Sequence, residues 1–201
     1  MLKLYHVPNT RSVRVAWLCE ELGVDCERIA VDFSPEYRST AEWRALSPMG
    51  KVPVLTDGEL TIFESGAMVE HILDRHGDGR LRPEAGTDAR AIYRQWCWFA
   101  EATLTRFLGE IISHARAFGD DRIEAVLEEL KGRSRAALDA VDAALQSRPY
   151  LCGDEFTAAD IMMGYSLLLA SLIGLMDGSR PALDDYWQRL SSREAFKRAN
   201  V

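Results

Sequence analysis

The hydrophobic pattern of this chain changes character at a ten-residue break, GDGRLRPEAG, which spans residues 77–86. Its glycines and its proline are typical of a linker. Before the break, short apolar runs of strand length alternate with stretches at helical spacing, whereas after it every apolar pattern has helical spacing. We therefore expect two domains, residues 1–76 and residues 87–201, joined by the linker 77–86.

The first domain reads as strand, helix, strand, helix, strand, strand, helix. Apolar runs predict strands at 2–7, 28–33, 51–56 and 60–63. Asp57-Gly58 predicts a hairpin turn between the last two strands. Helical spacing predicts helices at 12–22, 34–45 and 64–76, and Gly23 stands where a helix-terminating glycine belongs. A parallel βαβ unit joined to a hairpin, with helices packed on the sheet, is the thioredoxin-like arrangement.

The second domain is expected to be an all-helical bundle with long helices at 87–118, 120–145 and 157–176 and two short helices after them. The stretch 161–176 is strongly apolar, but a membrane span needs about 20 residues. We therefore interpret it as a buried central helix and expect no membrane association. Thr157 and Asp160 have the spacing of a capping box at its start.

Composition restricts the functions that need to be considered. The net charge is −7, and a nucleic-acid-binding protein normally carries a basic face, so no nucleic-acid partner is expected. The four cysteines form no CxxC pair and have no histidine at metal-ligand spacing, which predicts free thiols and no metal. The first residues, MLKLYHVPNTRSV, contain no apolar core of signal-peptide length, so we expect a cytoplasmic protein.

The segment Asn9-Thr10-Arg11-Ser12 follows the first predicted strand and precedes the first predicted helix. Ligands of open α/β sheets bind at the carboxyl ends of strands. The unpaired N–H groups of a first helical turn favour an anion. The segment is therefore a candidate anion site, although Asn9 or Ser12 is also compatible with a simple helix cap.

Two further segments of the first domain have unusual features. Pro53 interrupts the apolar run GKVPVL, and a proline in a strand survives best at an edge, where the backbone of Val52 can pair with a peptide ligand. Glu64-Ser65 opens the next predicted helix, where a helix N-terminus can hold a carboxylate and Glu64 an ammonium group. The alternative is that Ser65 is an ordinary N-cap and Glu64 a solvated charge. Together the segments offer an amino-acid anchor, a backbone rail and an anion site, which fits a short thiol peptide.

Four blocks of the sequence, YHVPNTRSVRVAWLCEELG, SPMGKVPVLTDGELTIFESGAMVEHI, QWCWFAEATL and YLCGDEFTAADI, resemble the successive blocks of cytosolic glutathione transferases. The resemblance implies an N-terminal thioredoxin-like α/β domain with an all-α C-terminal domain, glutathione as co-substrate, and a homodimer. It also implies a cis Pro53, a Val52 backbone that pairs with the cysteinyl part of glutathione, and a γ-glutamyl group held by Glu64 and Ser65. Lys51 is expected near the glycyl carboxylate, and Arg11 is assigned to the same glutathione-binding set.

The family pattern leaves the thiol-activating residue open. Asn9 aligns with the catalytic serine of zeta-type or the cysteine of omega-type relatives, and Ser12 with the second cysteine position of a thioredoxin motif. Neither tyrosine nor cysteine is available at Asn9, so we do not expect a covalent mixed disulfide with the protein. Asn9, Thr10 and Ser12 are the candidates for stabilising the thiolate, and we favour Asn9 or Thr10.

The resemblance further predicts that an apolar electrophile binds between the domains, against Arg106, Phe107 and Ile111. The expected function is a glutathione transferase that presents glutathione thiolate to this electrophile. Glutathione-dependent peroxide or disulfide reduction is one alternative. The other is a non-catalytic binding protein that has kept the fold.

Overall fold

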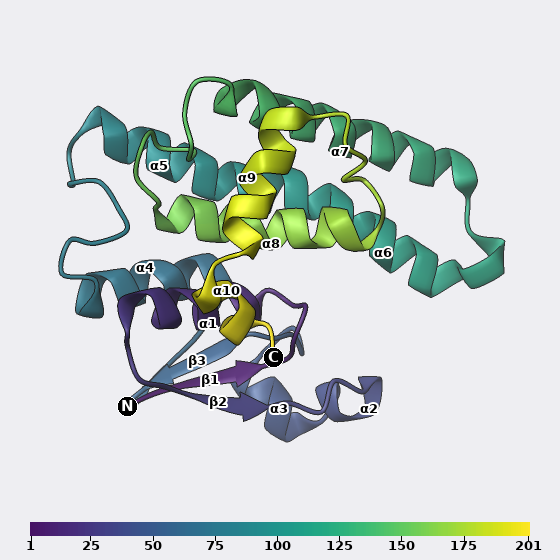
Figure 1. Cartoon of the computed structure of the whole chain (residues 1–201). Coiled ribbons are helices and arrows are strands. Elements are labelled where there is room, and N and C mark those ends of the chain that lie inside the picture. The colour runs from purple at the N-terminus through teal and green to yellow at the C-terminus, as the bar shows by residue number, and fades with distance from the viewer. The chain divides into compact units, whose positions relative to one another are not determined.

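A computed structural model describes residues 1–201 and divides them into two compact units, most of whose elements are labelled in Figure 1. The first unit contains Met1–Leu81 together with Ser192–Val201, and the second contains Arg82–Ser191. The boundary between Leu81 and Arg82 lies within the expected linker. The division differs from the expected limits in one respect, because residues 192–201 belong to the first unit and not to the helical one.

A four-stranded mixed sheet forms the centre of the first unit, with the strand order β2-β1-β3-β4. The strands are β1 (Leu2–His6), β2 (Cys26–Ala30), β3 (Val54–Asp57) and β4 (Leu60–Phe63). β2 runs parallel to β1, while β3 is antiparallel to both β1 and β4. This confirms the predicted thioredoxin-like arrangement, with β2 and β3 shifted by a few residues from their expected positions.

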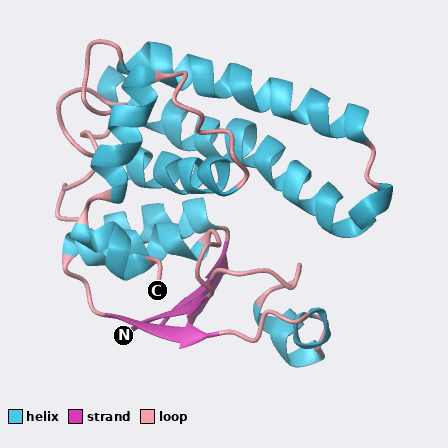
Figure 2. Cartoon of the chain, turned by 45° about the vertical axis from the view of Figure 1, so that its right-hand side comes forward, coloured by secondary structure: helices cyan, strands magenta, loops and turns pink.

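Helices cover both faces of this sheet. On one face α1 (Ser12–Leu22) and α4 (Ser65–His76) form a layer against the strands, as Figure 2 shows in cyan over magenta. On the other face α3 (Ala41–Leu46) buries Trp43, whose ring meets that of Tyr5 edge to face at 5.5 Å between centroids. Successive side chains of β1 point to opposite faces of the sheet, as the two-residue period of a strand requires. Leu4 is buried on the α1 side, and Tyr5 lies on the α3 side.

The single helix expected at 34–45 is in fact two short ones, α2 (Pro35–Arg38) and α3. Thr40 separates them in an extended conformation, and its hydroxyl accepts a hydrogen bond from the Trp43 N–H at 3.2 Å. Threonine is favoured at such an N-cap because its side chain satisfies an otherwise unpaired helical N–H. The cap restarts the chain at an angle that a continuous helix would not give.

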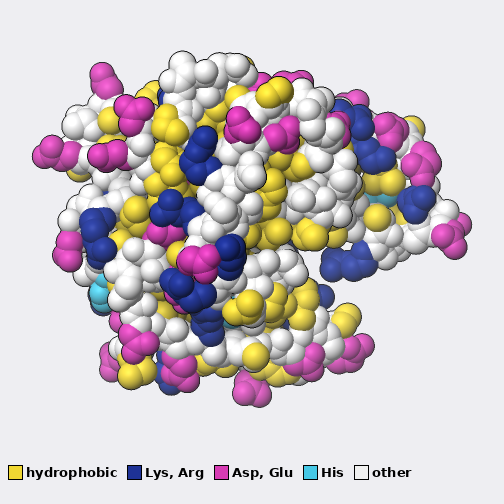
Figure 3. All heavy atoms as spheres, in the orientation of Figure 1, with side chains coloured by type: hydrophobic (Ala, Val, Ile, Leu, Met, Phe, Trp, Pro, Cys, Tyr) yellow, Lys and Arg dark blue, Asp and Glu magenta, His cyan; other side chains and the backbone are white.

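The short helix α10 (Glu194–Ala199) packs against α1 and so returns the chain to the first unit. The Phe196 ring meets Trp17 edge to face at 4.9 Å, and Arg193 donates to both carboxylate oxygens of Glu21 at 2.6 and 2.8 Å. Arg198 pairs with Glu20 at 2.7 Å. Figure 3 accordingly shows acidic and basic side chains side by side over α10. Sequence periodicity finds this helix but contains no information on which unit it joins.

The second unit is entirely helical. Its elements are α5 (Asp88–Trp98), the π-helical segment η1 (Phe99–Thr105), α6 (Arg106–Phe118), the 3₁₀ turn η2 (Gly119–Asp121), α7 (Glu124–Leu145), α8 (Ala158–Leu172) and α9 (Pro181–Ser191). The helix expected at 87–118 therefore contains a π-helical interruption, which a hydrophobic pattern does not reveal. The predicted central helix is confirmed: every residue of α8 from Ala158 to Ala170 is buried. None of the helices has both the length and the apolar character that crossing a membrane requires.

Asp160 holds the start of α8 in place. The predicted capping box is present, with the Thr157 N–H donating to Asp160 Oδ2 at 2.8 Å. The other oxygen, Oδ1, accepts from the Leu151 N–H at 3.0 Å and from the Tyr186 hydroxyl at 2.7 Å. Burial raises the pKa of this carboxyl, and the hydrogen bonds that it accepts act in the opposite direction. One side chain thus joins the preceding loop, α8 and α9.

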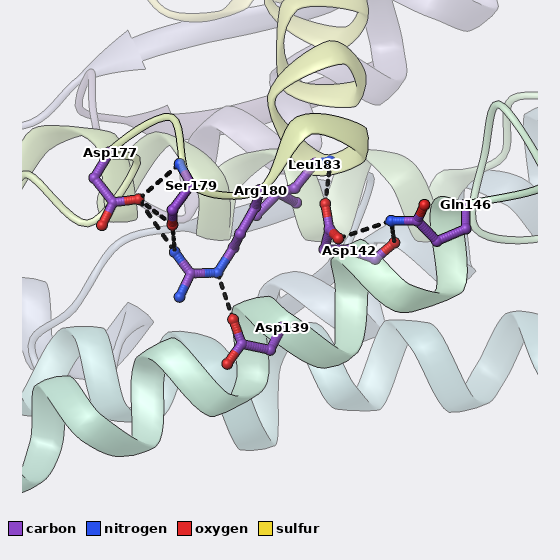
Figure 4. A network of polar contacts seen from close by, with 7 residues as sticks. All are labelled: Asp139, Asp142, Gln146, Asp177, Ser179, Arg180 and Leu183. Carbon is purple, nitrogen blue, oxygen red and sulfur yellow. Dashed lines mark hydrogen bonds and ion pairs between the residues drawn. The ribbon is translucent and has the colours of Figure 1, made fainter.

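A second polar network joins α7 to the start of α9 (Figure 4). Arg180 donates to Asp139 of α7 at 2.7 Å, and Asp142 accepts from the Leu183 N–H at 2.9 Å. The latter N–H belongs to the first turn of α9, where no intrahelical acceptor is available. Asp142 therefore caps one helix from the side of another.

We expect Asp160→Ala to lower the free energy of unfolding of the second unit by at least about 3 kcal/mol. It leaves two buried N–H groups and one hydroxyl without an acceptor, each at a cost of about 1–3 kcal/mol. Urea denaturation followed by circular dichroism measures the change. The exposed Asp154→Ala is the matched control and is expected within about 0.5 kcal/mol of the wild type. Equal stabilities for the two variants would contradict the assigned role.

Candidate functional site

The register of the sheet brings the three predicted segments together at one end. Tyr5 pairs with Val54, the first residue of β3, and Val54 pairs with Phe63, the last residue of β4. The loop that follows β1, the residues before β3 and the residue after β4 therefore leave the sheet on the same side. Each lies at this end because of backbone pairing alone, whatever its side chains do.

Ser12 is the first residue of α1, and its side chain is enclosed by the loop that follows β1. Its hydroxyl lies 2.8 Å from His6 Nδ1 and 2.8 Å from Thr10 Oγ1, donates to the Val7 carbonyl at 2.9 Å and accepts from the Val7 N–H at 3.2 Å. The residue has no exposed surface. Its hydrogen-bonding capacity is used within the protein, so Ser12 holds the loop together and the structure gives no support to its direct contact with a thiol.

Thr10 and Asn9 occupy more open positions in the same loop. Thr10 is half-buried, and its hydroxyl donates to the Val7 carbonyl at 2.7 Å. Asn9 is exposed and adopts a left-handed backbone conformation with φ +58°. Asparagine tolerates this region better than most residues because its short polar side chain bonds locally. Among the three predicted thiol-activating residues, Asn9 and Thr10 are the accessible ones.

The helix-cap interpretation of Asn9 and Ser12 is wrong. Half-buried Arg11 occupies the N-cap position of α1, and its side chain makes no capping hydrogen bond. Thr10 instead meets the first turn of α1: its hydroxyl accepts from the Ser12 N–H at 3.3 Å and its carbonyl from the Val13 N–H at 3.0 Å. The attraction of this helix start for an anion therefore comes from the helix dipole.

His6 supports the loop that follows β1 from the interior of the first unit. It is buried, and its Nε2 lies 3.2 Å from the main-chain oxygen of Val201 while Nδ1 contacts Ser12. Burial lowers the pKa of the imidazole from its ordinary value of 6.5; the Val201 oxygen opposes this shift and the charge of Arg28 adds to it. A neutral His6 whose Nε2–H donates to Val201 presents the lone pair of Nδ1 to the Ser12 hydroxyl, and the single Ser12 proton is then shared between Nδ1 and the Val7 carbonyl.

The segment before β3 contains the predicted cis bond, between Val52 and Pro53. The expectation of an edge strand is wrong, because Pro53 precedes β3, which lies between β1 and β4. Outside the ladder, the proline removes no hydrogen bond from the sheet. Ser47 fixes the approach to this segment: its hydroxyl accepts from the Lys51 N–H at 2.9 Å and donates to the Lys51 carbonyl at 2.7 Å. The Lys51 side chain is exposed, whereas Val52 and Pro53 are buried.

The segment after β4 differs from the expectation in its cap. Glu64, not Ser65, occupies the N-cap position of α4, and it does so with φ +77°. Ser65 is the first helical residue, is only 3% exposed, and accepts a hydrogen bond from Arg14 Nη1 at 3.2 Å. Glu64 itself is exposed at the helix N-terminus.

Arg14 is a residue that sequence reasoning missed. It is fully buried in α1, and its contact with Ser65 joins the first turns of α1 and α4. A charged side chain is rarely buried without a partner. The detectable signal was an arginine between Val13 and Val15 in a helix whose neighbouring positions are apolar.

The three residues predicted to contact the electrophile lie on α6 of the second unit. Ile111 is buried, while Phe107 is half-buried, with the guanidinium of Arg133 5.9 Å from its ring centre. Arg106 is exposed and pairs with Glu110 at 3.0 Å. Their role stays a prediction. No group of three or more histidine, cysteine, aspartate or glutamate side chains in residues 1–201 has the arrangement of a metal site.

Comparisons with known proteins point to one family. Residues 1–74 match the model of the glutathione S-transferase N-terminal domain, and residues 124–189 match that of the C-terminal domain. The chain is 30% identical over 181 residues to glutathione S-transferase 3 of Schizosaccharomyces pombe, covering 85% of this chain and 74% of that one.

Two similar solved structures contain bound glutathione. The theta class glutathione S-transferase from Xanthomonas axonopodis pv. citri, with glutathione bound, has a TM-score of 0.83 at 28% identity, covering 100% of this chain and 97% of that one. A glutathione transferase family member from Pseudomonas fluorescens pf-5, with two glutathione bound, has a TM-score of 0.87 at 25% identity, covering 98% and 91%.

We expect His6 to make the stability of the first unit depend on pH. Because folding lowers its pKa, the folded state binds fewer protons than the unfolded state, so stability is fully present above 6.5 and falls as the pH drops below that value. His6→Asn keeps a polar atom near Nδ1 but does not titrate. Urea denaturation at about pH 7.5 and about pH 5 should show a smaller acid-induced loss in the variant, by about 1.4 kcal/mol per unit of pKa shift. The same loss in both proteins would contradict this assignment.

Proposed function

The chain belongs to the glutathione S-transferase family and is a glutathione transferase, and from this premise we propose how it binds and activates glutathione. Glutathione lies at the end of the sheet where β1, β3 and β4 meet, as an extended peptide with its thiol at the β1–α1 loop. The bound thiol is held as a thiolate, which attacks an apolar electrophile.

The observation that carries this proposal is the convergence of the three segments. An amino-acid head needs one group for its carboxylate and one for its ammonium. The N-terminus of α4 with Ser65 supplies the first, and the exposed carboxylate of Glu64 supplies the second. Arg14 fixes Ser65 from within the unit, so the hydroxyl is oriented before the ligand arrives. These groups hold the γ-glutamyl part of glutathione.

The remaining parts of the peptide follow from the positions of the other segments. Val52 lies outside the β3 ladder, so its main chain pairs with the cysteinyl residue of the ligand. Exposed Lys51 is placed to neutralise the glycyl carboxylate, and half-buried Arg11 adds positive charge at the start of α1. The cysteinyl sulfur then lies over the loop that contains Asn9 and Thr10.

Activation of the thiol requires no acid–base residue. A free thiol has a pKa of about 8.5, and lowering it by two units takes about 2.7 kcal/mol of preference for the anion. One hydrogen bond to a charged group supplies about 1.5–3 kcal/mol, and a helix N-terminus about 0.3–1 kcal/mol. We assign the hydrogen bond to the Asn9 amide, because the Thr10 hydroxyl has one proton and already donates it to Val7.

The second substrate binds against α6, where Phe107 and Ile111 offer apolar surface and Arg106 a polar contact. We further propose that the protein acts as a homodimer in the cytoplasm, as the family likeness implies. No metal takes part in this mechanism, which depends on positioning and on stabilisation of the anion.

We expect Asn9→Ala to raise the pKa of the bound glutathione thiol by about one to two units, because it removes one charge-assisted hydrogen bond. Titration of thiolate absorbance of the complex measures this shift. Thr10→Val should shift it less, and Ser12→Ala should lower protein stability more than it changes the thiol. S-methylglutathione, which has no ionisable thiol, is the control ligand, and its affinity should be the same for the wild type and Asn9→Ala. An unchanged thiol pKa in all three variants would overturn this mechanism.

Reduction of peroxides or disulfides by glutathione is the second candidate function. It is favoured by Asn9, which replaces the usual hydroxyl, and by the relative that binds two glutathione molecules. Assays of the purified protein with an aryl halide, cumene hydroperoxide and a mixed disulfide separate the candidates. We expect conjugation of the aryl halide. Turnover of the peroxide or disulfide alone would favour reduction, and failure to bind a glutathione resin would favour a non-catalytic protein.

A further inference from the structure

Asn9 and Asn200 form a reciprocal pair within the first unit. The Asn9 main-chain N–H donates to Asn200 Oδ1 at 2.9 Å, and Asn200 Nδ2 donates to Asn9 Oδ1 at 3.0 Å. The two residues are 191 positions apart in the chain. The Asn200 carboxamide thus contacts both the backbone and the side chain of Asn9, the residue that we propose donates a hydrogen bond to the thiolate.

The pair determines which way the Asn9 amide faces. A main-chain N–H can only donate, so the Asn200 atom that meets it must be the carbonyl oxygen. The other terminal atom of Asn200 is then its NH₂ group, and the Asn9 atom that this group meets must be the oxygen. Asn9 Nδ2, its only side-chain donor, therefore points away from Asn200.

The position of Asn200 is itself well fixed. It follows α10 directly, where Ala199 is buried and Phe196 packs on Trp17. Arg28 donates to the Arg198 carbonyl, and the Val201 main-chain oxygen lies 3.2 Å from His6 Nε2. Contacts thus hold the chain on both sides of Asn200, which makes its carboxamide a fixed template for the loop.

We propose that Asn200 is a positioning residue that orients the Asn9 amide so that Nδ2 faces the glutathione sulfur. This inference rests on the proposed function, because the proposed function makes Asn9 the hydrogen-bond donor through which Asn200 acts. The carboxamide supports the left-handed conformation of Asn9 by accepting its N–H, and prevents the amide from turning its oxygen toward the thiolate. An oxygen in that place would repel the anion that the nitrogen stabilises.

The Asn200→Asp substitution tests the orientation directly. One carboxylate oxygen can still accept the Asn9 N–H, but the other now demands a donor, which the Asn9 side chain provides only by turning its NH₂ group away from the ligand. We expect the pKa of bound glutathione thiol to rise by about one to two units, as in Asn9→Ala. Asn200→Leu, similar in size but unable to bond, should give a smaller rise, because the amide becomes free to adopt either orientation.

The added charge of Asn200→Asp requires its own control. In an Asn9→Ala background the same substitution retains the charge but has no amide to turn, so a further rise of less than about half a unit is expected. A rise there as large as in the wild-type background would mean simple repulsion of the thiolate and would overturn the proposal. Thermal denaturation of each variant separates loss of stability from the change in the thiol.

Other outcomes distinguish failure of the Asn200 inference from failure of the proposed function. If glutathione binds with a lowered thiol pKa that neither Asn200 substitution changes, the positioning role is overturned and the proposed function stands. The same conclusion follows if Asn9→Ala leaves the thiol pKa unchanged, since Asn200 then has no donor to act through. If wild-type protein binds no glutathione, or binds it with the pKa of the free thiol, the proposed function fails and this inference fails with it.

Discussion

Backbone pairing between β1, β3 and β4 is the constraint on which the candidate site depends. Because Tyr5 is opposite Val54 and Val54 is opposite Phe63, the ends of these strands are aligned. A slip of one residue would turn every side chain to the opposite face of the sheet and would move Leu4 and Leu55 out of the core. The apolar alternation that builds the core therefore also fixes the distance between the segments that we propose bind glutathione.

Two helix N-termini at this end of the sheet support the proposal that a chain without a catalytic tyrosine or cysteine at Asn9 stabilises an anion. α1 begins at the loop after β1, and α4 begins at Glu64 after β4. The dipoles of both helices are fixed by the fold, so no reorganisation is needed when charge develops on the ligand. The Arg14–Ser65 bond joins these two helix starts through the interior of the unit, at a position that solvent does not reach.

Local signals in the sequence predicted much of this structure. Asp57-Gly58 located the hairpin, Gly23 ended α1 with φ +68°, and Thr157 with Asp160 identified the start of α8, because each acts through neighbours a few residues away. The predictions that failed depend on contacts between residues far apart in the chain. Ser65 was expected to cap α4, but its hydroxyl is used by Arg14 from another helix, and the unit that α10 joins depends on Trp17 and Glu21, far from it in the chain. Hydrophobic periodicity describes one element at a time and cannot specify such contacts.

The loop after β1 shows how far these two kinds of information combine. The residue types of Asn9, Thr10 and Ser12 suggested three candidate donors, of which Asn9 and Thr10 were favoured, because a sequence shows which groups are present but not which are already bonded. The structure separates them: Ser12 is enclosed by His6 and Val7, whereas Asn9 is exposed. What fixes Asn9 is then not the loop itself but a carboxamide delivered by α10. The helix that the sequence assigned to the wrong unit therefore contributes to the geometry of the proposed thiol site, and it does so because it packs on α1.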